Sequence, residues 1–76
     1  SNLVHVQISS KKLNPKAIFE LAASVSQSGA NIERVTRLAS DPLTVIEFLI
    51  SGATKETLSQ ALPPIALSNS AEITVQ

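Results

Sequence analysis

The sequence predicts an α+β sandwich whose elements follow in the order strand, helix, strand, strand, helix, strand. Apolar residues alternate with polar ones, as in half-buried strands, at both ends and in the middle of the chain. Two segments with apolar residues at helical spacing lie between these strands, and Pro and Gly separate the segments. With 76 residues, the chain is long enough for one domain, 1–76. Ser1 and Asn2 are interpreted as a remnant of tag cleavage.

The first strand is followed by an amphipathic helix. Apolar and polar residues alternate over residues 4–8, which predicts a strand. Asn14 can then accept hydrogen bonds from free backbone amides, and Pro15 suits the first helical position. Gly29 ends the helix, because glycine tolerates the left-handed backbone found just past many helix ends. The helix face expected on the core consists of Ile18, Leu21, Ala22 and Val25.

Two strands are predicted in the middle of the chain. Ile32, Val35 and Leu38 are three residues apart, so residues 31–38 are interpreted as a strand with a β-bulge, where one extra residue shifts the side-chain parity. Turn-forming residues at 40–42 follow. Residues 43–51 predict the central strand, because both of its faces are largely apolar and both are expected to be covered. Its core face consists of Ile46, Phe48 and Ile50.

The second half closes the sandwich. Gly52 ends the central strand, and Thr54 can cap a second helix over residues 54–62. Pro63 and Pro64 cannot donate to the helical ladder, so the helix ends or kinks there, with one short turn expected at 65–67. Residues 71–76 predict the last strand. Right-handed crossovers place both helices on one face of a four-stranded antiparallel sheet, the ferredoxin-like arrangement.

The opposite sheet face is expected to contact a partner. It should contain Leu3, His5, Val45 and Leu49. A face with this many apolar residues is unfavourable when it is exposed to water only. The second and fourth strands should be the edges of the sheet, with unpaired backbone groups. A small domain gains stability by burying an edge or a face against a second copy, and two-fold dimers are the commonest solution.

Composition argues against several classes of protein. Six basic and six acidic residues give a net charge of zero, which lacks the positive charge that nucleic-acid binding requires. RNA-binding relatives of this fold stack bases on aromatic residues, but Phe19 and Phe48 are expected in the core. No apolar run approaches the length of a membrane span, and the first strand is too short for a signal peptide. Without cysteine, the chain has no thiolate metal site and fits a cytoplasmic location.

A search for catalytic groups gives no enzyme. His5, the only histidine, has neither a carboxylate nor a nucleophile among its strand neighbours. The glutamates are dispersed along the chain and indicate no acid–base pair. We therefore expect no catalytic residue, no metal site and no cofactor in this domain.

Basic residues leave two alternatives open. Lys11 and Lys12 precede the first helix and could hold an anion together with its amino end, or they could be solvated residues of a loop without glycine. Arg34 and Arg37 could bind a ligand or form surface ion pairs with Glu33 or neighbouring carboxylates.

The segment 29–38, GANIERVTRL, resembles the start of the second strand in ACT domains, where a helix ends in Gly and Asn-Ile follows. With DPLT at 41–44 and IEF at 46–48, it is similar to the ACT domain that precedes the catalytic domain of phosphoserine phosphatases. There the segment reads roughly Gly-x-Asn-Ile-Asp-x-Ile-x-x-Leu-Ser-x-x-Pro-Val-x-x-x-Glu. The element order of the whole chain fits this family, but the specific residues are concentrated in 29–48.

The resemblance implies a module of a magnesium-dependent phosphatase of the haloacid-dehalogenase type, which hydrolyses phosphoserine in the last step of serine synthesis. Its nucleophilic aspartates and its Mg²⁺ site would lie in a following domain. ACT domains of this family are expected to pair with a second ACT domain or another copy and to bind serine or another small amino acid between them. The corresponding effector-binding residues are Ser10, Lys12, Leu13 and Asn14 of one copy with Asn31 and Ile32 of its partner.

One departure from the family pattern keeps an alternative open. Effector-binding ACT domains usually carry a glycine in the first loop, which lets the ligand approach the backbone. Residues 9–13 contain none, and the aspartate expected before the helix is missing. A structural module that only holds subunits together is therefore the alternative to an effector-binding domain. A third reading, an acylphosphatase-like site, would use Lys12 with Asn14.

Overall fold

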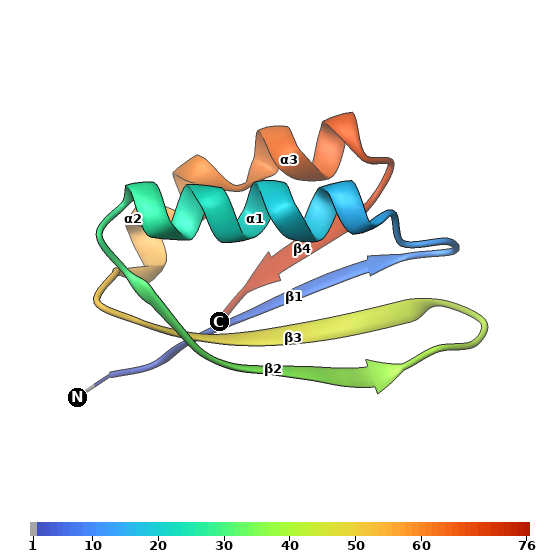
Figure 1. Cartoon of the computed structure of the whole chain (residues 1–76), viewed down its shortest axis with the longest axis horizontal. Coiled ribbons are helices and arrows are strands. Elements are labelled where there is room, and N and C mark those ends of the chain that lie inside the picture. The colour runs from blue at the N-terminus through green and yellow to red at the C-terminus, as the bar shows by residue number, and fades with distance from the viewer. Residues whose placement is uncertain (1) are drawn as a thin grey trace.

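The computed structural model describes residues 2–76, so the interpretation of Ser1 as part of a tag lies outside the described residues. The elements are β1 (Val4–Ser10), α1 (Pro15–Gln27), β2 (Asn31–Ala39), β3 (Thr44–Ser51), α2 (Lys55–Ala61), α3 (Pro63–Ser68) and β4 (Glu72–Val75). They form two layers, with all helical segments on one side of the sheet (Figure 1).

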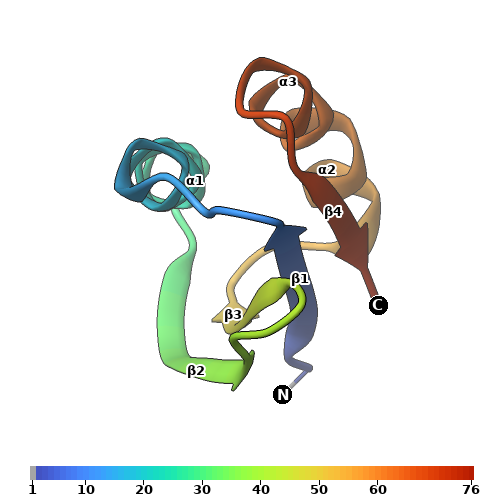
Figure 2. The ribbon, with the colours of Figure 1, turned by 90° about the vertical axis from the view of Figure 1, so that its right-hand side faces the viewer.

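The strands form one antiparallel sheet in the order β2-β3-β1-β4, which confirms the predicted ferredoxin-like fold. The central strands are β3 and β1, and the edges are β2 and β4, as the sequence predicted. Figure 2 shows that α1 lies over the β2 side of the sheet, whereas α2 and α3 lie over the β4 side. Each half of the sheet therefore has its own helical cover.

The core fills the space between the sheet and the helices. Alternation along β1 and β3 directs every second side chain to the helical layer, and Phe48 lies there with only 1% of its surface exposed. On α1, the buried residues Ala17, Leu21 and Val25 are four apart and form one stripe that packs on the sheet. The remaining buried apolar residues are Val4, Val6, Ile8, Ala30, Ile46, Ile50, Leu58 and Leu62.

Helix α1 has the predicted ends, but one predicted core residue is wrong. Asn14 caps the helix, with Oδ1 accepting from Lys16 N at 2.9 Å, and Gly29 follows the helix with φ 78°. Phe19, expected in the core, is 76% exposed. At about 100° per residue, position 19 points about 200° away from Ala17, which is buried on the sheet.

Strand β2 contains two irregularities where the sequence predicted one bulge. The register with β3 shifts between Ile32 and Arg34 and again between Arg37 and Ala39. Because Val35 pairs with the core residue Phe48, it lies on the helical face of the sheet. The bulges thus decide which residues of β2 face the helices.

The second helix is broken at the two prolines, as predicted. Thr54 Oγ1 accepts from Thr57 N at 3.0 Å and caps α2, which ends at Ala61. Pro63 and the following proline then occupy the first positions of α3, where no intrahelical donor is needed. This segment is a six-residue helix instead of the single turn expected at 65–67.

The face opposite the helices is less apolar than expected. Register places Leu49 opposite His5 on that face, and both Val45 and Leu49 are half-buried, so β3 is not covered on both sides within this chain. The centre of the face is polar, because Gln7 and Glu47 are paired there, with Gln7 Nε2 donating to Glu47 Oε2 at 3.4 Å.

Candidate functional site

The six predicted effector-binding residues lie at two opposite ends of α1. Ser10 ends β1, and Lys12, Leu13 and Asn14 form the loop before the helix. Asn31 and Ile32 begin β2, just beyond the other end of the helix. The 13 residues of α1 separate the two groups by about 20 Å at about 1.5 Å per residue (Figure 1). One copy of the chain does not bring the two groups together.

The amino end of α1 is already satisfied by its own cap. Pro15 has no amide proton, Lys16 N donates to Asn14 Oδ1, and Ala17 N donates to Asn14 O at 2.9 Å. An anion at this end would have to displace the cap to reach these donors. The first amides of α1 are therefore not free to hold an anion together with Lys11 and Lys12, and both lysines are exposed. Asn14 keeps only its Nδ2 group for a ligand.

A hollow of about 650 Å³, lined mostly by polar or charged residues, opens on the β4 side of the same loop. Ser10 Oγ donates to Ser70 O at 3.4 Å across it, which joins the end of β1 to the segment between α3 and β4. Lys12 also lines it, so two predicted effector-binding residues share a hollow with the α3–β4 connection. The full lining is Ser9, Ser10, Lys11, Lys12, Leu43, Asn69, Ser70, Ala71 and Glu72.

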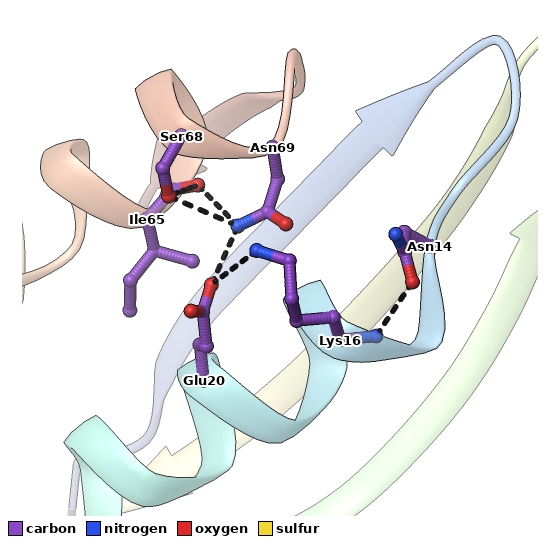
Figure 3. Close-up of polar contacts among 6 residues, drawn as sticks. All are labelled: Asn14, Lys16, Glu20, Ile65, Ser68 and Asn69. Atoms are coloured by element: carbon purple, nitrogen blue, oxygen red, sulfur yellow. Dashed lines mark hydrogen bonds and ion pairs between the residues drawn. The ribbon is translucent and has the colours of Figure 1, made fainter.

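A hydrogen-bond network links α1 to α3 beside this hollow (Figure 3). Asn69 Nδ2 donates to Glu20 Oε1 at 2.7 Å and to Ile65 O at 2.7 Å, and Lys16 Nζ lies 3.4 Å from the same Glu20 oxygen. The hydrogen bond from Asn69, with a further contribution from Lys16, lowers the pKa of Glu20 below its usual value. This network fastens the two helices, since the amide of Asn69 donates both to Glu20 on α1 and to Ile65 on α3.

A second hollow, about 390 Å³ in volume, separates the first half of α1 from β2. We call it the α1–β2 groove. Figure 2 shows β2 diverging from α1 along its length, and Val35 is left 54% exposed on the helical face. The sequence analysis missed this groove, because Phe19 was assigned to the core. The groove is lined by Leu13, Pro15, Ile18, Phe19, Val35, Arg37, Thr44 and Ile46.

His5 has a carboxylate neighbour that the sequence analysis did not identify. Its Nδ1 lies 3.6 Å from Glu47 Oε2, on the face opposite the helices. The two residues are 42 positions apart in the sequence, and only the register of β1 with β3 brings them together. No cluster of three or more His, Cys, Asp or Glu residues that could hold a metal ion occurs within residues 2–76.

Comparison with known proteins places the chain in a family. The model of the ACT domain matches residues 4–76. A phosphoserine phosphatase of Streptomyces coelicolor is 40% identical over 63 residues, which cover 83% of this chain but only 15% of that protein. In the part of the chain that the structure describes, no helix is long and apolar enough to cross a membrane.

Solved structures agree with this assignment at the level of the fold. An ACT domain protein from Streptococcus pneumoniae superimposes with a TM-score of 0.80 at 11% identity, covering 100% of this chain and 90% of the other. A formyltetrahydrofolate deformylase from Burkholderia mallei gives 0.82 at 9% identity, covering 100% of this chain and 28% of the other. The same fold thus occurs both as a nearly complete chain and as a part of a larger enzyme.

Proposed function

Because this chain belongs to the ACT domain family, we propose that it is a regulatory module of a phosphoserine phosphatase that acts in serine synthesis in the cytoplasm. The 40% identity to a phosphoserine phosphatase supports this assignment, and the chain spans only 15% of that relative's length. The catalytic machinery, with nucleophilic aspartates and Mg²⁺ of the haloacid-dehalogenase type, would lie outside residues 1–76. This domain then contributes binding and assembly.

The observation that carries the proposal is the separation of the two predicted groups of effector-binding residues by the length of α1. If β2 pairs antiparallel with β2 of a second ACT domain, the start of the partner strand lies beside the end of this one. The end of β2 and the loop before α1 lie at the same end of the molecule (Figure 1). Pairing would thus bring Asn31 and Ile32 of the partner toward Lys12 and Asn14, completing one site from two copies.

The edge strand β2 suits such a pairing better than β4. It has nine residues against four, so it offers more unpaired backbone groups. Leu38 is 50% exposed near its end, and apolar side chains there gain from contact with a partner. Two-fold pairing at β2 would make a continuous eight-stranded sheet from two copies of four strands.

The ligand we propose for this site is serine or another small amino acid. Lys12 Nζ supplies a positive charge for the carboxylate, and Asn14 Nδ2 remains free to donate because only Oδ1 serves the helix cap. The side chain of Asn31 from the partner would add a second amide. Each of these residues is exposed in the single copy, as an interface site requires.

Two measurements on the 76-residue chain test this proposal. Analytical ultracentrifugation should show a dimer, and calorimetry with serine should show binding at about millimolar affinity or tighter. Lys12→Gln and Asn31→Ala should each weaken serine binding. The matched control is Lys55→Gln, which removes a charge at the start of α2 on the other side of the molecule. A strictly monomeric chain that binds no amino acid contradicts the proposal.

A purely structural pairing domain is the second candidate, and two observations favour it. The loop before α1 has a side chain at every position, and the first amides of α1 are satisfied by Asn14 and so are not free for a carboxylate. This candidate predicts a dimer whose stability does not change with serine or any other amino acid. The two measurements above separate it from the effector-binding domain.

A further inference from the structure

The α1–β2 groove has the composition of a small-molecule site. Six of its eight lining residues are apolar, from Leu13 in the loop to Ile46 on β3, and Ile46 forms a buried floor with 9% exposure. Small-molecule sites are concave and mostly apolar, and a few polar groups fix the orientation of the ligand. At about 390 Å³, the groove is within the range of such sites.

The charge in the groove has one sign only. Arg37 is its single charged lining residue, and no Asp or Glu lines it. Arg37 forms no ion pair with any carboxylate within residues 2–76. The hydroxyl of Thr44 is the other polar side chain in the lining. By contrast, the hollow between α2, α3 and β4 has no charged lining residue, and the hollow beside the loop has Glu72 together with two lysines.

We propose that the α1–β2 groove binds a small aliphatic carboxylate that carries no ammonium group. The guanidinium of Arg37 would hold the carboxylate, and the aliphatic chain would lie against Ile18 and Val35. An amino acid is a poorer ligand here, because its ammonium group would be desolvated without an anionic partner in the lining. A neutral apolar compound is also a poorer ligand, because it would place an apolar group against the Arg37 guanidinium without pairing its charge.

This inference goes beyond the proposed function, since one copy of the chain supplies every lining residue. It also predicts a ligand of different charge from the zwitterion proposed for the loop. Only Leu13 belongs to both sets of residues. The two proposals can therefore fail separately.

The test is a titration of the 76-residue chain followed by ¹H–¹⁵N correlation spectra at constant ionic strength. The probes are 4-methylpentanoate, leucine, which adds only the ammonium group, and 4-methylpentanamide, which removes only the charge. We expect 4-methylpentanoate to shift the amides of Phe19, Val35 and Thr44. The amide should bind up to about fivefold more weakly, the upper end for a single solvent-exposed ion pair. Leucine should also bind more weakly than 4-methylpentanoate, because its ammonium group would be desolvated without an anionic partner.

Two variants with equal loss of charge complete the test. Arg37→Gln should weaken 4-methylpentanoate to the level of the neutral amide. Arg34→Gln should leave binding unchanged, because Arg34 pairs with Leu49 and lies on the opposite sheet face. The inference is overturned if 4-methylpentanoate causes no localised shifts, if leucine binds equally well, or if the two arginine variants behave alike.

A second copy of the chain is the competing occupant of the groove. In that case Val35→Ser would convert a dimer to a monomer, and 4-methylpentanoate would shift no groove amide in either form, which also overturns the inference. Shifts of the Lys12 and Asn31 amides with serine report on the proposed function alone. Their presence or absence does not affect the outcome for the groove.

Discussion

Truncation of each phenylalanine to alanine should separate a core residue from a surface residue. A buried phenylalanine removes about 200 Å² from water, which at about 25 cal/mol per Å² is about 5 kcal/mol. Phe48 is 1% exposed, so Phe48→Ala should cost most of this amount, about 3–5 kcal/mol. Phe19 is 76% exposed and buries about a quarter as much, so Phe19→Ala should cost about 1 kcal/mol or less.

Urea unfolding of the two variants, followed by far-UV circular dichroism, measures both costs. A domain of this size has a total stability of about 4–11 kcal/mol. Phe48→Ala should therefore lower the urea midpoint by about a quarter or more, or leave the chain unfolded in buffer. Phe19→Ala should shift it only slightly, at a protein concentration low enough to keep the chain monomeric. Comparable losses for the two variants would refute the assignment of Phe19 to the surface of α1.

Two further predictions concern the polar contacts of α1. Asn14→Ala removes the side-chain acceptor for Lys16 N and should lower the free energy of unfolding by about 1 kcal/mol. Asn14→Ser keeps an acceptor and should retain most of that stability. Equal stability of the three proteins would show that the cap contributes nothing. The lowered pKa of Glu20 contributes stability above its usual value of 4.5, which is lost as the pH falls through the lower folded-state value. In Asn69→Ala, the free energy of unfolding should therefore fall less between about pH 7 and about pH 3 than in the parent chain, and an unchanged pH dependence would contradict the assigned cause.

Most of the fold could be predicted from the sequence, because helix caps, turns and strand alternation are each determined by residues that are close together in the chain. Asn14, Gly29 and Thr54 occupy helix ends whose backbone geometry these residue types favour, and the structure has them at those ends. Alternation in β1 and β3 correctly predicted the core faces of both strands. The failure at Phe19 has a physical reason, since α1 packs on the sheet through a narrow stripe centred on Leu21, and a large apolar side chain outside the stripe stays exposed.

The α1–β2 groove could not be predicted from the same patterns, because its lining depends on the exact position of the bulges in β2. A shift of one residue moves a side chain to the other face of a sheet. Arg34 and Arg37 are three residues apart, so their opposite faces agree with simple alternation, and the sequence alone gives no reason to prefer one of them as a ligand group. The register places the two arginines on different faces, because Arg37 pairs with the core residue Ile46 and therefore faces the helical layer, whereas Arg34 pairs with Leu49. Because β2 diverges from α1, Arg37 lines the groove beside partly exposed apolar side chains such as Phe19 and Val35.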